Sequence, residues 1–255
     1  MGKTTTAVNL AACLAASEQS TLLVDCDSQA NATAAIGFAK DPSRRTLYHC
    51  LILNEPFDKI VQKSQVDGLD VVPADKNLAG AAVELVLAEN REYKLQALLN
   101  QIRDRYKFIV LDCPPALDLL TLNALVSASS VLVPIQCEYL ALEGVSELLD
   151  TLMRIRRTLN PSLEIEGILL TMYDERTTLS RQVATDLRSF FGTQVFQSVI
   201  PRNVRLAEAP SFGKPIIFYD IHSKGAEGYT QLAQEVIAND EKRTGKRARS
   251  ADSGA

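Results

Sequence analysis

Short apolar segments alternate with longer helical patterns from one end of this 255-residue chain to the other. The segments are nearly continuously apolar, and this pattern is typical of strands that are buried on both faces of a sheet. The predicted strands cover residues 21–27, 69–74, 107–113, 130–136 and 165–171, with weaker candidates at 194–200 and 214–219. Strand–helix alternation over the whole length predicts an α/β fold, in which a mostly parallel, twisted sheet carries helices on both faces.

The clearest helical pattern covers residues 139–159, where apolar side chains recur at i, i+3 and i+4 spacing and Pro161 follows the end. From residue 240 the sequence changes to DEKRTGKRARSADSGA, which is polar, basic and free of large apolar side chains. We therefore expect one domain over residues 1–239, incomplete at its N-terminus, and a disordered basic tail over residues 240–255.

Composition limits the classes of protein to which the chain can belong. Hydrophobic residues make up 46% and charged residues 23%, which is ordinary for a globular protein, and the net charge of −4 neither requires nor excludes a nucleic-acid partner. No apolar run approaches the roughly 18 residues of a membrane span. Five scattered cysteines without a CxxC pair favour reduced thiols over a disulfide framework or a zinc site. These features predict a cytoplasmic protein.

The first ten residues, MGKTTTAVNL, contain the end of a phosphate-binding loop. Such a loop reads G-x-x-x-x-G-K-[ST], follows a strand and opens a helix. Gly2, Lys3 and Thr4 match its last three positions, but Met1 stands where the first half of the loop would be. A lone GKT is common, so the motif needs support from elsewhere in the chain.

Three other polar segments follow predicted strands, at the edge of the sheet where α/β folds bind their ligands. DCDSQANAT places Asp25 and Asp27 at the end of one strand, and DCPP places Asp112 where a Walker B aspartate would stand. The loop PRNVRLAEAP, which contains Pro201 and Asn203, follows a third strand. Four such features at strand ends predict a phosphate site.

The residue types suit that chemistry. Helix-start amides after Gly2 can point at phosphate oxygens, and Lys3 can reach the β- and γ-phosphates. The Thr4 hydroxyl can coordinate Mg²⁺, which Asp112 can hold through water. Asp27 is a candidate for orienting the attacking water, because phosphoryl transfer depends mainly on positioning and electrostatics. The alternative is that the aspartates only cap the helices that follow their strands.

Taken in order, the sequence blocks resemble those of the ParA/Soj ATPases of bacterial chromosome and plasmid partition, which form the deviant Walker A branch of the P-loop NTPases. The blocks are GKTTTAVNLAACLA, LLVDCDSQANAT, LDCPPALDLLTLNAL, VPIQCEYLALEGVSELLDTL and IPRNVRLAEAPSFGKPIIFYDIHSKGAEGY. The likeness runs from Gly2 to about Val236. In the second block, Ser28 and Ala30 replace the proline and glycine of the family's D-x-D-P-Q-G-N-A-T.

The resemblance implies a role for each matching residue. The implied nucleotide-binding residues are Gly2, Lys3, Thr4, Thr5, Asp112, Pro201 and Asn203, of which the last two match the loop that borders the adenine. Thr4 and, through water, Asp112 are the implied Mg²⁺ ligands. Lys3 and Asp27 are the implied catalytic residues.

The resemblance also implies a reaction cycle. Family members bind ATP with Mg²⁺, form ATP-dependent homodimers and bind DNA without sequence preference. A ParB-type centromere-binding partner then stimulates hydrolysis, and the cycle segregates a chromosome or a plasmid. This implies a cytoplasmic, nucleoid-associated ATPase.

One departure from the family concerns the start of the chain. The signature lysine of the family's K-G-G-V-G-K-T-T loop, the two glycines after it and the preceding central strand have no counterpart here. Two neighbouring strands would then keep unpaired edges, and we expect the chain as written to be a poor ATPase. Met1 stands where the family has valine, and GTG encodes valine internally but methionine at a start. We therefore hypothesise that the protein begins about 10–20 residues earlier, one strand plus half a loop; the alternative is a genuine truncation.

Basic residues supply the candidate DNA contacts. In the body of the chain they are Arg181, Arg188, Arg202, Arg205 and Lys214; in the tail they are Lys242, Arg243, Lys246, Arg247 and Arg249. Neutralising several phosphates would give salt-dependent, sequence-independent binding. The alternative for any single arginine is a solvated surface position.

Other functions remain open. A truncated relative would associate with DNA without hydrolysing ATP. A membrane-cycling division-site ATPase would need a C-terminal amphipathic helix, and the tail has no large apolar residue for one. A redox relative would need cluster cysteines. A ligase of the same branch is compatible with the fold, although the LTLNAL and RLAEAPSFGKPI blocks argue against it.

Overall fold

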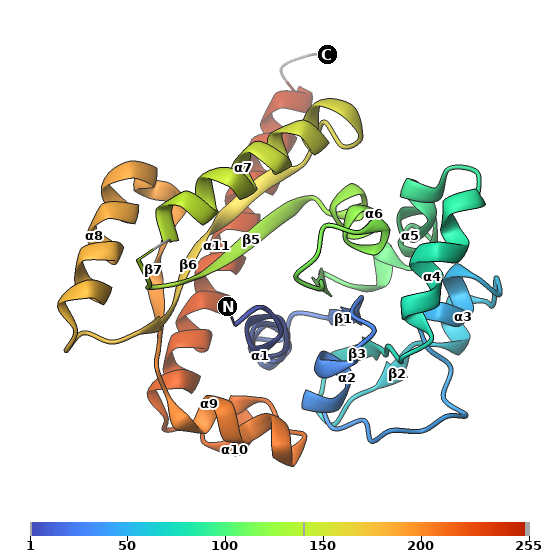
Figure 1. Ribbon diagram of the computed structural model, residues 1–255, viewed down its shortest axis with the longest axis horizontal. Coiled ribbons are helices and arrows are strands. Elements are labelled where there is room, and N and C mark those ends of the chain that lie inside the picture. The colour runs from blue at the N-terminus through green and yellow to red at the C-terminus, as the bar shows by residue number, and fades with distance from the viewer. Residues whose placement is uncertain (1, 140, 253–255) are drawn as a thin grey trace.

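The computed structural model describes residues 2–139 and 141–252, and its strands form two sheets (Figure 1). In the first sheet the strand order is β2-β3-β1-β4, and in the second it is β5-β6-β7. All pairs are parallel except β2 with β3. The strands are β1 Thr21–Asp25, β2 Gln62–Lys63, β3 Leu69–Val72, β4 Phe108–Asp112, β5 Ser130–Gln136, β6 Glu164–Tyr173 and β7 Val195–Pro201. The mostly parallel α/β fold predicted from the sequence is confirmed.

Helices connect the parallel strands and cover the sheets (Figure 1). They are α1 Lys3–Ala16, α2 Asn31–Ala35, α3 Leu47–Leu51, α4 Leu78–Glu84, α5 Lys94–Leu99, α6 Leu119–Ser127, α7 Ala141–Thr158, α8 Thr178–Phe191, α9 Val204–Glu208, α10 Ile216–Tyr219 and α11 Lys224–Asp252. Single 3₁₀ turns lie at Phe57–Lys59, Leu85–Leu87, Arg91–Tyr93, Arg103–Arg105, Gly192–Gln194 and Ala209–Phe212. The helix predicted at 139–159 is α7.

Helix α1 lies in the interior, where it contacts β1, β4 and α11. Its residues from Thr6 to Ala15 are buried, which is why its sequence is apolar on nearly every side. The hydroxyl groups of Thr6 and Tyr229 lie 3.2 Å apart and connect α1 to α11. This burial fixes the position of the α1 N-terminus, where the GKT motif lies.

Strands β4 and β5 each pair on one side within the described part of the chain. β4 pairs with β1, and β5 pairs with β6, so the two sheets are not joined by a ladder of hydrogen bonds. The residues of β1 are fully buried, whereas four of the five residues of β4 and six of the seven of β5 are only half-buried. β4 and β5 are therefore edge strands in the described part of the chain.

Two expectations from the sequence were wrong. Residues 214–219 were predicted as a strand, but α10 begins at Ile216, because the Pro215 carbonyl accepts from the Phe218 and Tyr219 amides and the Ile216 amide donates to Asn9 Oδ1 at 2.6 Å. Residues from 240 onward were predicted to be disordered, but α11 continues to Asp252. Residues 253–255 lie outside the described part, as do the side chains of Lys246, Arg247 and Arg249.

Candidate functional site

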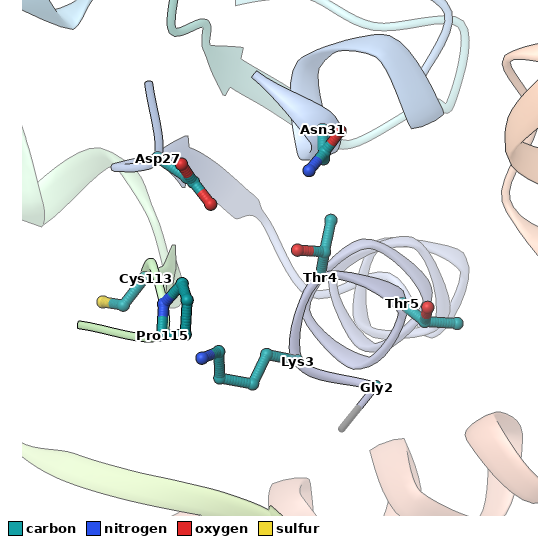
Figure 2. Close-up of a pocket in the computed structure, with 8 residues that line it drawn as sticks. All are labelled: Gly2, Lys3, Thr4, Thr5, Asp27, Asn31, Cys113 and Pro115. Carbon is teal, nitrogen blue, oxygen red and sulfur yellow. The ribbon is translucent and has the colours of Figure 1, made fainter. Parts of the chain in front are cut away.

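The N-terminus of α1 and the segments after β1 and β4 enclose a pocket of about 250 Å³ (Figure 2). Its position follows from strand register: Asp25 and Asp112 are Cα partners, so β1 and β4 end at the same level and their following loops meet. The lining residues are Gly2, Lys3, Thr4, Thr5, Asp27, Asn31, Cys113 and Pro115. The structure therefore brings the GKT motif and Asp27 together, as the sequence predicted.

The first turn of α1 is arranged to receive an anion. Gly2 is the N-cap, with a left-handed backbone at φ 73°, and no side chain caps the amides that follow it. A Cβ on Gly2 would lie at an ordinary 3.7 Å from Thr171, so the backbone conformation rather than lack of space favours glycine there. No acidic residue lies in the first turn, and the helix dipole favours negative charge at this end.

The polar side chains of the pocket point into one space. Figure 2 shows the Lys3 side chain extending toward Pro115, and the Asp27 carboxylate and the Thr4 hydroxyl facing each other across the pocket. Asp27 is buried, and its Oδ1 accepts from the Gln29 amide at 3.0 Å. A cation, a hydroxyl and a carboxylate around one cavity can bind a phosphate group with its metal ion and orient a water molecule.

Asp112, at the end of β4, does not line this pocket but interacts with the pocket residue Thr4. It is 2% exposed, and its Oδ2 atom is buried without a hydrogen-bond partner. Burial raises the pKa of Asp112 to about 7, an effect that the Thr4 hydroxyl partly offsets. A buried, unpaired carboxylate oxygen beside a threonine hydroxyl fits a Mg²⁺ site, because a hard cation binds oxygen ligands and would satisfy this atom directly or through water.

Asp25 has a different role from its neighbours. Its Oδ2 accepts from the amide and the hydroxyl of Thr33 at 2.8 and 2.7 Å, and its Oδ1 accepts from the Asp27 amide at 3.1 Å. The Thr33 hydroxyl in turn accepts from the Ala74 amide at 2.9 Å. Asp25 thus anchors the first turn of α2 and the backbone of Asp27, although the N-cap of α2 is Ala30 and not an aspartate.

Three lining residues were missed by sequence reasoning. Asn31 begins α2, and Cys113 and Pro115 follow Asp112 in the DCPP segment. Their nearness in sequence to Asp27 and Asp112 was the available signal. Conversely, the pocket lining does not include Pro201 or Asn203; the Asn203 side chain caps α9 by accepting from the Arg205 amide at 2.8 Å.

The candidate DNA contacts differ in their surroundings. Arg181 and Arg188 are exposed on α8, and Arg202 and Lys214 are exposed near α9 and α10. Arg205 is also exposed, but it pairs with Glu208 at 3.0 Å and Asp220 at 3.5 Å. In the tail, Lys242 is exposed and Arg243 pairs with Glu166. Among the residues described, no helix has the length and apolar character needed to cross a bilayer.

A lysine and a threonine at an uncapped helix N-terminus, facing aspartates at the ends of two adjacent parallel strands, define a P-loop protein of the NTPase class. Residues 1–165 match the family model described as an AAA domain. The chain is 49% identical to the chromosome partitioning protein ParA of Myxococcus xanthus over 97% of its length and 87% of that protein. It is 50% identical to the sporulation initiation inhibitor protein Soj of Bacillus subtilis over 94% of both. The chain belongs to the ParA/Soj family of chromosome-partitioning ATPases.

A solved structure extends the likeness to the three-dimensional fold. Cobyrinic acid a,c-diamide synthase from Mycobacterium smegmatis, with bound ADP and magnesium, has a TM-score of 0.81 and 32% sequence identity. The match covers 94% of this chain and 90% of the synthase. The P-loop α/β fold predicted from the sequence therefore agrees with both the sequence relatives and a solved structure.

Proposed function

We propose that the protein binds ATP with Mg²⁺ and hydrolyses it to ADP and phosphate as part of a DNA partition cycle. The observation that carries this proposal is the pocket at the N-terminus of α1, where Lys3, Thr4 and Asp27 converge and Thr4 interacts with Asp112, which has an unpaired oxygen. The ADP and magnesium of the M. smegmatis synthase support nucleotide as the ligand.

Each polar residue then has one task. The uncapped amides after Gly2 and the Lys3 ammonium bind phosphate oxygens, and Thr4 and Asp112 hold Mg²⁺, which neutralises negative charge on the phosphates when it is bound. The Asp27 carboxylate accepts a hydrogen bond from the attacking water and so orients it. Asp25 keeps Asp27 in place through the amide hydrogen bond at 3.1 Å. Pro201 and Asn203 border the adenine.

The wider cycle is proposed from the names of two relatives, the chromosome partitioning protein ParA of M. xanthus and the sporulation initiation inhibitor protein Soj of B. subtilis. The nucleotide is enclosed between two copies of the chain, and the dimer binds DNA without sequence preference through Arg181, Arg188, Arg202 and Lys214. A ParB-type partner stimulates hydrolysis. The protein acts in the cytoplasm on the nucleoid, and its cargo is a chromosome in preference to a plasmid.

The test is ATP turnover by purified protein with Mg²⁺, with and without DNA and the cognate ParB-type protein. We expect Lys3→Ala to lose nucleotide binding. Asp27→Ala should still bind nucleotide but hydrolyse it about 10²-fold more slowly. Lys76→Ala, at an exposed lysine outside the pocket, is the matched control and should behave like the parent.

Failure of the purified protein to bind nucleotide would refute the proposal. Turnover by Asp27→Ala at the parent rate would refute the role of Asp27.

A further inference from the structure

Two of the five cysteines, which are scattered in the sequence, come together at the phosphate pocket. Cys26 directly follows β1 and Cys113 directly follows β4. The preceding residues are Cα partners in the parallel ladder, and the Cys26 amide donates to the Asp112 carbonyl at 2.9 Å, which extends the pairing one residue further. Adjacent strands lie about 4.8 Å apart, and a disulfide spans Cα atoms about 4.4–6.8 Å apart.

The two side chains are on the same face of the sheet. Cys26 is 1% exposed and belongs to the core cluster that packs beneath α3 to α6, and Cys113 packs against the same cluster while half-buried. A hydrogen bond between the two thiols, followed by burial, raises the pKa of Cys26 well above its ordinary value. Cys113 also lines the pocket and is only half-buried, so it is the less buried of the two cysteines.

We propose that Cys26 and Cys113 form a redox-active dithiol, which closes to a disulfide when the protein meets hydrogen peroxide and thereby weakens nucleotide binding. The sulfur of Cys113, the less buried of the two cysteines, attacks one oxygen of the peroxide, the O–O bond breaks, and a sulfenic acid and one water are formed. The Cys26 sulfur then attacks the Cys113 sulfur, and its proton leaves with the displaced hydroxide as a second water. The two thiols lose two electrons in total, and one peroxide is reduced to two waters.

The link to nucleotide binding comes from the position of Cys113 and rests on the proposed function. Cys113 lies between Asp112 and the pocket residue Pro115, and Figure 2 shows its sulfur directed away from Thr4. A covalent bond to Cys26 fixes this segment against β1, so that Asp112 and Pro115 lose the freedom to adjust around a phosphate and its metal ion. Cytosolic disulfides are usually transient and redox-sensing, which suits a pair that closes only under peroxide.

The first experiment detects the disulfide itself and does not depend on nucleotide binding or hydrolysis. The reduced, full chain is treated with hydrogen peroxide, its remaining thiols are alkylated, and its unreduced peptides are mapped by mass spectrometry. We expect a 26–113 cross-link that dithiothreitol reverses, with free thiols falling from five to three. Cys113→Ser should abolish the cross-link, and Cys50→Ala, which removes a buried thiol on α3, should retain it. Oxidation of Cys113 without the cross-link would overturn the proposal.

The second measurement is titration of a fluorescent ATP analogue into reduced and oxidised protein. We expect the affinity to fall several-fold on oxidation and to recover with dithiothreitol, whereas Cys113→Ser should show no change on peroxide treatment. Equal affinities in the two forms would overturn the effect on the site. If neither form binds nucleotide, the proposed function fails, while the peptide map still decides whether the dithiol closes.

Discussion

Lys107 and Asp240 form an ion pair, with Nζ and Oδ2 2.6 Å apart, that joins the residue before β4 to helix α11. One turn further along α11, Arg243 Nη1 lies 2.5 Å from Glu166 Oε2 on β6. Because β4 and β6 belong to different sheets, α11 is tied by charge to both of them. These contacts hold residues 240–243 in the helix, although their composition alone predicts disorder.

Arg243→Ala should therefore loosen the end of α11. The Glu166 side chain is 6% exposed and would keep only its hydrogen bonds with Ser130 at 2.8 Å and Asn239 at 3.4 Å. We expect the free energy of unfolding to fall by about 1–2 kcal/mol and amides 236–245 to exchange faster by hydrogen–deuterium mass spectrometry. Lys242→Ala, one residue away and exposed, should change neither; equal exchange in both variants would contradict this role of Arg243.

Thr33→Val should impair both stability and catalysis. The substitution removes the hydroxyl that donates to Asp25 at 2.7 Å and accepts from the Ala74 amide at 2.9 Å, so two buried groups lose a partner. We expect a loss of about 2–3 kcal/mol in denaturant unfolding. Because Asp25 also holds the Asp27 amide, kcat should fall more than KM changes. Thr185→Val, at an exposed position on α8, is the control; an unchanged kcat in Thr33→Val would contradict the positioning role.

Asp112 makes the stability of the metal-free protein depend on pH. Its pKa is 3.8 in an ordinary setting and about 7 when buried here, so the folded state keeps a proton that the unfolded chain releases over this interval. Stability from this group is fully present below about pH 4 and is lost progressively as the pH rises to about 7. The loss can reach about 4 kcal/mol, at about 1.4 kcal/mol for each pH step across the interval.

Asp112→Asn removes this ionisation. In the absence of Mg²⁺ and nucleotide, we expect the variant to melt at a higher temperature than the parent at about pH 8, with the difference shrinking toward pH 4. Melting curves recorded at a series of pH values measure this difference in melting temperature between the variant and the parent. A difference that does not depend on pH would show that Asp112 is not the group responsible.

The sheet and the site centre could be predicted because their signals are local. Continuous apolar runs mark the buried parallel strands, and parallel strands end at one edge, so Lys3, Asp27 and Asp112 had to converge once the fold was fixed. The sequence could not predict that Asp25 is a structural anchor while Asp27 faces the pocket. This difference depends on the Thr33 hydroxyl, which donates to Asp25 and accepts from the Ala74 amide only in the folded chain.

The errors have the same cause. The apolar run 214–219 is compatible with a strand or with a buried helix turn. The helix turn is favoured by Asn9, which is far away in the sequence and whose Oδ1 accepts from the Ile216 amide. Within α11, Asp240 and Arg243 contact Lys107 and Glu166, and composition near residue 240 cannot reveal these contacts.

Ala30→Gly should stabilise the protein. Ala30 has φ 54°, in the left-handed region, where a Cβ costs about 1–2 kcal/mol and glycine is unstrained. Because glycine also adds freedom to the unfolded chain, we expect a net gain of about 0.5–1 kcal/mol in the free energy of unfolding. Ala34→Gly, at an exposed helical position in α2, should instead destabilise the chain. Equal or lower stability of Ala30→Gly would show that the strain is absent.

The candidate DNA contacts on α8 and α9 should differ in how much they contribute to binding. Arg181 and Arg188 lie two turns apart on α8, so both exposed side chains share one face, whereas the charge of Arg205 is already engaged by Glu208 and Asp220. We expect replacement of both α8 arginines by alanine to weaken ATP-dependent binding to random-sequence duplex. The slope of log affinity against log salt should fall by about 0.9 for each lost phosphate contact. Arg205→Ala should leave that slope nearly unchanged. Fluorescence anisotropy at several salt concentrations measures both; a larger slope change for Arg205→Ala would place the DNA surface on α9 instead, because only a side chain that neutralises phosphates releases counterions.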